Sequence, residues 1–270
     1  MDTEKRKLGA LLRSSRQVIL PGVLAVCAAA LMPGVQAFGV TVDTFDGSPV
    51  RLQTGVGSPL EVSSFVVDDS ILGMERDLVL RQFTAEGHAQ LLVGDFGGGT
   101  LMDLSLSSMT SAQAIITWDG LDGDLSLDPN GLGGVDLTAD GSEDALTLSV
   151  LFSDLPVGAA ITVFSGPNDA SILEVSLEPN VDDSQNEVYG IAFSAFEILS
   201  GNGADFTNVG AIQLAIGGTQ TAFDLQFDLL EQGAAAVVAS PEANAMSLSL
   251  LGILAIVASG RLQRPTRRNR

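Results

Sequence analysis

Apolar and polar residues alternate through the middle of this chain, and this period of two limits its possible folds more than any other feature. The segments 102–106, 173–177, 212–216 and 223–229 each place apolar side chains at every second position. A strand with this pattern buries one face and leaves the other in water, as antiparallel sheets require. Further strands are expected at 65–67, 78–83, 89–93, 114–118, 146–152, 161–164 and 189–193.

Turn signals separate these segments, and no helical stripe of any length interrupts them. Asp-Gly or Asn-Gly pairs occur at 46–47, 119–120, 122–123, 130–131, 140–141 and 202–203. Such pairs favour the tight turns that join antiparallel strands. The pattern predicts an all-β fold, a two-sheet antiparallel β-sandwich of the jelly-roll-like kind, over residues 38–232. About 200 residues suffice for one substantial core.

The first 37 residues have the order of a secretory signal peptide. Basic residues come first, an apolar stretch covers 18–32, and small residues precede an expected cleavage between Ala37 and Phe38. Cys27 ends a possible lipobox, but Val26 occupies the place where Gly, Ala or Ser is needed. Plain secretion is therefore favoured over lipidation. The sequence predicts a signal helix here that leaves with Cys27, the chain's one cysteine.

The last thirty residues predict a membrane anchor. A linker at 233–240 leads to Pro241 and Glu242, and an uncharged apolar run of 18 residues follows at 243–260. As a helix this run spans roughly 27 Å, close to the ~30 Å of a bilayer's hydrocarbon layer. The tail then carries its basic residues at Arg261, Arg264, Arg267, Arg268 and Arg270. Positive-inside bias places that tail in the cytoplasm and the rest of the chain outside.

The segment between the two ends is strongly acidic. Residues 38–242 contain Arg51, Arg76 and Arg81, no lysine, and 31 acidic residues. Such a surface repels phosphate backbones and anionic lipid heads, which excludes nucleic-acid binding. It attracts cations instead. Without Cys27 the mature chain has no disulfide, so packing must stabilise the domain.

The three-part tail resembles a PEP-CTERM sorting segment, found on bacterial exported proteins that an exosortase processes. The resemblance rests on Pro241 and Glu242, the apolar run and the arginine cluster, and it departs where Ala243 replaces the expected second proline. The middle also resembles sandwich ectodomains common among such proteins, in the stretches 70–77, 117–120, 133–137 and 204–214. The resemblance implies export, processing by signal peptidase and an exosortase-type enzyme, and association with the envelope or exopolysaccharide. An uncleaved segment would leave the protein tethered to the membrane, and processing would release it to the cell surface or matrix.

Catalysis finds little support in the sequence, and no cofactor is expected. His88 is the one histidine and has no partner pattern around it, so a surface or strand-end position is expected. Calcium is the metal hypothesis that the sequence supports, because Asp119, Asp122 and Asp124 crowd a Gly-rich loop with Asp128 and Asn130. The competing interpretation is that these residues make turns and add solubility. A weaker calcium hypothesis joins Asp43 and Asp46 to Glu231, if the first and last strands are neighbours.

Carbohydrate binding is the alternative function. Binding modules stack sugars on exposed Trp and Tyr rings, but this chain has one of each. Trp118 ends an apolar run and Tyr189 lies in a predicted strand, so a core or rim position is expected for both. The sequence therefore favours a non-enzymatic, structural or adhesive surface protein. A carbohydrate-binding module, with or without calcium, is the alternative, and a secreted hydrolase is the third possibility.

Overall fold

The computed structural model describes residues 40–96, 99–181 and 186–233. Within these ranges the chain consists of fourteen β-strands and two single 3₁₀ turns, η1 (Leu72–Met74) and η2 (Phe193–Ala195). No helix in this part of the chain has the length and hydrophobicity needed to cross a membrane. The predicted signal helix and C-terminal helix lie outside the described residues.

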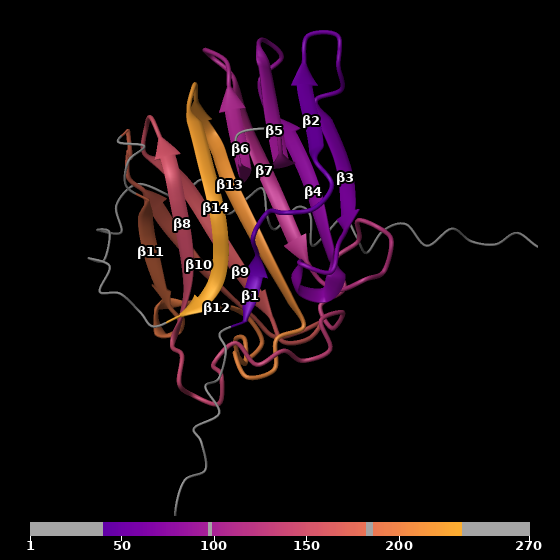
Figure 1. Cartoon of the computed structure of the whole chain (residues 1–270), viewed down its shortest axis with the longest axis vertical. Helices are drawn as coiled ribbons and strands as arrows, with labels where there is room; N and C mark the ends of the chain where they lie inside the picture. Colours follow the sequence, from indigo (N-terminus) through magenta and orange to yellow (C-terminus); the bar gives the residue numbers. More distant parts are fainter. Residues whose placement is uncertain (1–39, 97–98, 182–185, 234–270) are drawn as a thin grey trace, which may run out of the picture. The chain divides into compact units, whose positions relative to one another are not determined.

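The strands form two seven-stranded sheets that lie face to face, as Figure 1 shows. Every strand pair is antiparallel, so the predicted two-sheet sandwich is confirmed. Sheet A contains, in spatial order, β11 (Glu187–Ala192), β8 (Ala145–Ser153), β14 (Asp224–Gly233), β6 (Thr100–Leu106), β5 (His88–Asp95) and β2 (Val50–Gly55), and β1 (Thr41–Asp43) pairs with β14. Sheet B contains, in spatial order, β12 (Glu197–Ser200), β10 (Ala170–Leu177), β9 (Val157–Phe164), β13 (Ala211–Thr221), β7 (Ser111–Trp118), β4 (Glu75–Gln82) and β3 (Glu61–Val67).

The core lies between the sheets and is built from the alternating apolar residues. Leu78, Leu80 and Ile116 of sheet B are fully buried with Leu225 and Phe227 of sheet A. Burying side chains of this size stabilises the fold by roughly 1.5–3 kcal/mol each. Residues 38–242 contain no cysteine, so packing and not disulfides stabilises this part of the chain.

The alternation predicted for 223–229 fails at its end. The register of β14 against β8 shifts between Phe227 and Leu229, which is a β-bulge. A bulge adds one residue to a strand and so reverses which side chains face inward. Leu229 is consequently half-buried, and Leu230 takes the core position.

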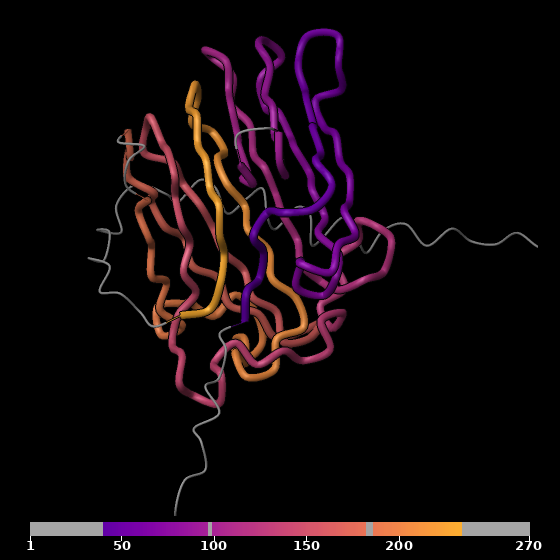
Figure 2. The backbone as a smooth tube through the Cα atoms, viewed as in Figure 1, coloured from indigo at the N-terminus to yellow at the C-terminus, as the bar shows by residue number. Residues whose placement is uncertain are grey.

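The turn signals serve two kinds of connection. Asp46-Gly47 and Asn202-Gly203 lie in short connections, before β2 and after β12. The other four pairs all fall in the single long connection between β7 and β8, residues 119–144, and so do not mark separate hairpins. The smooth trace in Figure 2 shows this connection running across the end of the sandwich. It contains the predicted calcium ligands.

Candidate functional site

The candidate site is built on the neighbouring strands β4 and β7. Asp77 of β4 pairs with Thr117 of β7, so Glu75 lies across from Asp119, the first residue after β7. Side chains alternate along a strand, and opposite residues in a sheet share a face. Arg76 and Trp118 point into the core, and Glu75, Asp77 and Asp119 lie together on the outer face of sheet B.

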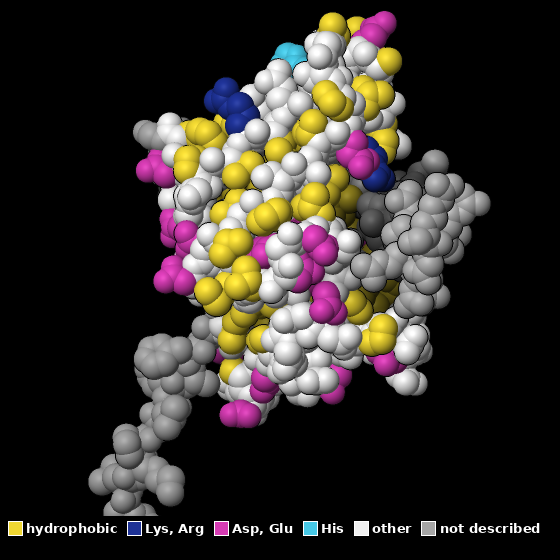
Figure 3. All heavy atoms as spheres, turned by 90° about the vertical axis from the view of Figure 1, so that its right-hand side faces the viewer, with side chains coloured by type: hydrophobic (Ala, Val, Ile, Leu, Met, Phe, Trp, Pro, Cys, Tyr) yellow, Lys and Arg dark blue, Asp and Glu magenta, His cyan; other side chains and the backbone are white. Residues whose placement is uncertain are grey.

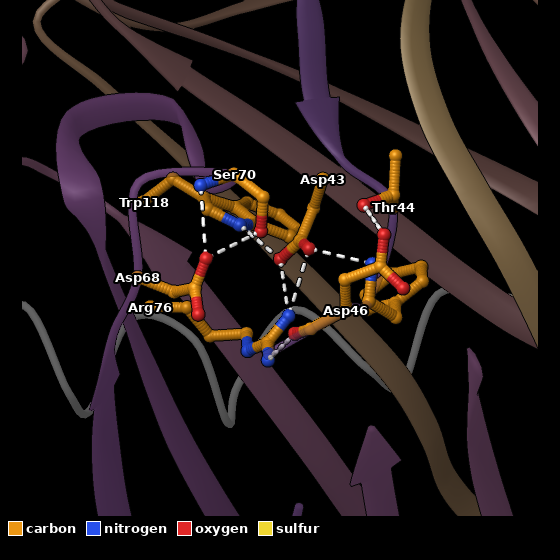
Figure 4. A network of polar contacts seen from close by, with 8 residues as sticks. Asp43, Thr44, Asp46, Asp68, Ser70, Arg76 and Trp118 are labelled. Atoms are coloured by element: carbon orange, nitrogen blue, oxygen red, sulfur yellow. Dashed lines mark hydrogen bonds and ion pairs between the residues drawn. The ribbon is translucent and has the colours of Figure 1, made fainter. Parts of the chain in front are cut away.

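On the inner side, one carboxylate ties the two sheets together (Figure 4). Asp43 of β1 accepts hydrogen bonds from Arg76 Nη1 at 2.7 Å and from Trp118 Nε1 at 2.8 Å. All three side chains are fully buried. Burial raises the pKa of Asp43, and the Arg76 charge opposes that rise. Arg76 Nη2 also donates to the Asp46 carbonyl at 3.0 Å.

The weaker calcium hypothesis is wrong in its chemistry although its topology is confirmed. First and last strands are neighbours, with Thr41 of β1 opposite Glu231 of β14. Asp43, however, is neutralised by Arg76 inside the core. The Asp46 carboxylate accepts a hydrogen bond from the Thr44 hydroxyl at 2.8 Å. Arg76 therefore occupies the Asp43 carboxylate, which the hypothesis needs as a metal ligand.

On the outer side, three carboxylates are buried together with no cation of the described residues beside them, and we call them the acidic cluster: Glu75, Asp77 and Asp119. Their residues are 1%, 3% and 1% exposed. Glu75 Oε2 accepts a hydrogen bond from the Gly123 amide at 3.1 Å, and Asp119 Oδ2 accepts one from the Asp128 amide at 2.7 Å. Glu75 Oε1 and both oxygens of Asp77 are buried without a hydrogen-bond partner.

Burial, with repulsion from neighbouring carboxylates as a further cause, raises the pKa values of all three groups. Burial raises the pKa of Asp77 to about 8, with further contributions from the charges of Asp119, Glu75, Asp122 and Asp124. Burial likewise raises the pKa of Asp119 to about 6, although its hydrogen bond from Asp128 opposes the shift. The pKa of Glu75 is raised for the same main reason. Like charges this close disfavour joint ionisation.

The loop after Asp119 folds back over the acidic cluster. Gly131 packs so closely on the Asp119 carbonyl oxygen that an added Cβ would lie 1.5 Å from it. Leu127 packs against a small apolar cluster on the outer face of sheet B, made of Phe164, Ala170 and Ala211. These contacts hold the loop against the sheet.

The two other predicted calcium ligands make turns within this loop. Asp122 Oδ1 accepts from the Asp124 amide at 3.0 Å, and Asp124 Oδ1 accepts from the Ser126 amide at 2.6 Å. Asp122 and Asp124 are both exposed. Nowhere in the described ranges are three acidic, histidine or cysteine side chains already arranged around one point as metal ligands. The sequence indicates Asp119 but not Glu75 and Asp77, because the proximity of these residues depends on the pairing of β4 with β7.

The single histidine, tryptophan and tyrosine have structural positions. His88 is exposed at the start of β5, as predicted for a strand-end residue. Trp118 is fully buried, and Tyr189 is 6% exposed with its hydroxyl accepting a hydrogen bond from the Glu178 amide at 2.9 Å. Neither the Trp118 ring nor the Tyr189 ring is therefore available to stack on a sugar.

Exposed rings do occur on the outer face of β3 and β4, at two phenylalanines. Phe65 of β3 is 44% exposed, and Phe83, directly after β4, is 47% exposed. Between them Glu61 forms an ion pair with Arg81, its partner in the register. We call these four residues the β3–β4 strip. Figure 3 shows the edge where β2 and β3 lie, with hydrophobic side chains spread along it and acidic side chains gathered near its middle.

Comparison with known proteins gives only distant likenesses. No family model matches the chain, and no curated protein matches it. Among solved structures, a family 11 carbohydrate-binding module from Clostridium thermocellum, in complex with a β-1,3-1,4-mixed-linked tetrasaccharide, has 10% identity and a TM-score of 0.33, covering 73% of this chain and 96% of that one. The solution structure of CtCBM11 has 11% identity and a TM-score of 0.39, covering 75% and 99%. TmCBM61 in complex with β-1,4-galactotriose has 9% identity and a TM-score of 0.26, covering 50% and 72%.

Proposed function

We propose that this chain is an exported, non-catalytic surface protein whose sandwich binds a polysaccharide along the β3–β4 strip. One observation carries the proposal: two exposed phenylalanine rings bracket an exposed ion pair on one face. Exposed apolar side chains that gather on one face mark interaction sites more often than single scattered ones do. The resemblance of the C-terminal segment supports export to the envelope.

The chemistry of the strip suits an extended sugar chain. Asp77, the register partner of Phe65, lies six residues before Phe83, which corresponds to about 20 Å along an antiparallel strand. Phenylalanine rings offer rigid apolar faces for the carbon–hydrogen faces of sugars. The Arg81 guanidinium donates hydrogen bonds and the Glu61 carboxylate accepts them, so hydroxyl groups between the rings would find partners of both kinds.

A glycan array probed with the purified protein tests this proposal. We expect binding to one class of extracellular polysaccharide, lost when Phe65 and Phe83 are both replaced by alanine. Phe96 supplies the matched control, because it is 44% exposed and follows β5 in sheet A. Phe96→Ala should bind as the wild type does. If the variant with both Phe65→Ala and Phe83→Ala still binds the glycan, the β3–β4 strip is not the binding surface.

A second candidate function is a passive structural or adhesive role, with no specific glycan. It is favoured by the pairing of β1 with β14, which places Thr41 opposite Glu231. The first and last strands of the sandwich thus lie side by side, toward the lower end in Figure 1. This arrangement is compatible with attachment of the domain at one point. An array without a specific hit would favour this candidate. Turnover of a glycoside substrate that a single carboxylate substitution abolishes would overturn the non-catalytic assignment of both candidates.

A further inference from the structure

The acidic cluster has no counter-charge among the residues that the structure describes. Both carboxylate oxygens of Asp77 are buried without a partner, in a residue that is 3% exposed. Glu75 Oε1 is in the same condition, in a residue that is 1% exposed. Burying an ionised carboxylate without a partner costs several kcal/mol, so native proteins pair such groups or bind metals with them.

The arginines of the described ranges are all committed elsewhere. Arg76 leaves β4 on the opposite face and pairs with Asp43. Arg81 pairs with Glu61, and the Arg51 guanidinium lies 5.9 Å from the centre of the Phe96 ring in sheet A. Residues 38–242 contain no lysine. Among the described residues no cation is placed to neutralise the acidic cluster, so a neutralising cation would come from outside this part of the chain.

We propose that the acidic cluster binds a divalent cation, Ca²⁺, between the outer face of β4 and the loop that follows β7. Calcium takes six to eight oxygen ligands, from carboxylates, carbonyls and water, in flexible geometry. Asp77 offers two free oxygens and Glu75 offers one. Asp119 offers the oxygen that does not accept from the Asp128 amide. This donor set is oxygen alone, which suits a hard cation and not zinc.

The loop can supply the remaining ligands. Asp122 and Asp124 are exposed, and the hydrogen bonds described for their carboxylates each use one oxygen, Oδ1. Their charges already act on Asp77 and Glu75, because both contribute to the raised pKa values there. A bound cation would draw these two side chains inward and reverse that repulsion. Magnesium demands near-ideal octahedral geometry and keeps its waters, so a loop that closes by side-chain rotation favours calcium.

Titration calorimetry of the full chain, purified in detergent and stripped with chelator, tests the proposal without any glycan present. We expect one Ca²⁺ to bind per chain and the melting temperature to rise with Ca²⁺, since a ligand that binds only the folded state stabilises it. Asp77→Asn and Glu75→Gln should each weaken Ca²⁺ binding by at least about tenfold. A loss of this size is typical even for residues that only hydrogen-bond to a metal ligand. Glu86→Gln, an exposed acid of the β4–β5 turn, should leave binding unchanged.

The variants also separate a metal ligand from a structural residue. Asp77→Asn removes an uncompensated charge, so without calcium it should melt no lower than the wild type while losing the rise that calcium gives. Unchanged calcium affinity in Asp77→Asn, or a wild type that neither binds calcium nor melts higher with it, would overturn the proposal. Equal binding of Mg²⁺ would overturn the assignment to calcium. Each result is independent of the glycan array, so this proposal and the proposed function can fail separately.

Discussion

A single carboxylate, that of Asp43, connects three distant parts of the chain. Its partners Arg76 and Trp118 lie 33 and 75 residues away in sequence, and both belong to sheet B. The Arg76 guanidinium also lies 5.9 Å from the centre of the Phe45 ring, which is fully buried. An ion pair of this kind contributes little net stability compared with apolar packing, but removing one partner leaves an uncompensated charge. We therefore expect its main effect to be on the position of β1 against sheet B.

Replacing Asp43 with alanine should be among the most damaging changes in the sandwich. It leaves the Arg76 charge buried and the Trp118 indole N–H without its acceptor, and we expect the free energy of unfolding to fall by about 3–5 kcal/mol. Urea unfolding measures this. Asp46→Ala is the control, because Arg76 uses the backbone carbonyl of Asp46 and not its carboxylate. A loss as small in Asp43→Ala as in Asp46→Ala would show that the buried pair does not hold β1 in place.

The paired strands β4 and β7 separate two electrostatic environments across one backbone layer. Arg76 and Trp118 face the core, where both donate hydrogen bonds to the Asp43 carboxylate. The three residues of the acidic cluster face outward. Strand alternation alone produces this separation, because neighbouring residues in a strand point to opposite faces. A change of register by one residue would place the acids in the core.

This arrangement predicts an inverted pH dependence of stability when no divalent cation is present. The pKa of Asp77 is raised from 3.8 to about 8 and that of Asp119 from 3.8 to about 6. A raised folded-state pKa gives stability that is fully present below the unfolded value and lost as the pH rises through the folded one. The melting temperature in chelator should therefore fall between pH 5 and about pH 8.

The charges that face Asp77 identify which substitution tests this pH dependence. Glu75, Asp119, Asp122 and Asp124 all act on Asp77. Asp77→Asn should flatten the fall in melting temperature, and Glu86→Gln should leave its slope unchanged. A melting temperature that rises steadily from pH 5 to pH 8 in the wild type would contradict the buried cluster.

Local pattern predicts the strands of this fold well and predicts the site only in part. Alternation identifies segments such as 102–106, which lies within β6, because the order of apolar and polar residues in a strand reflects which of its side chains are buried. The acidic cluster depends on a pairing between Asp77 and Thr117, forty residues apart along the chain, and no local pattern records that register. The Asp-Gly pairs near Asp119 identify a loop correctly, but only the folded chain places that loop over β4. Trp118 shows the same limit, since its buried partner Asp43 is remote in sequence.

The sandwich as a whole is acidic and contains no lysine, and its first and last strands are neighbours. Thr41 and Glu231 are paired, so the chain enters and leaves the domain at one place. A surface with so many acidic groups and so few basic ones repels anionic lipid heads and keeps the body in solution. The β3–β4 strip interrupts that acidic surface with two phenylalanine rings and an arginine. Tethering through one end would leave the strip accessible to a polymer outside the cell.

The orientation of the whole chain provides the last prediction, and it depends on the basic tail at Arg261, Arg264, Arg267, Arg268 and Arg270, which lies outside the described residues. Positive charges next to an apolar run hold that end on the cytoplasmic side. Replacing all five arginines with glutamine should reduce retention of the tail, so that less sandwich is displayed at the cell surface, as measured by protease digestion of intact cells. Replacing them with lysine is the matched control, because it keeps the charge, and it should preserve display. Equal surface display in the glutamine and lysine variants would mean that the tail does not set the topology.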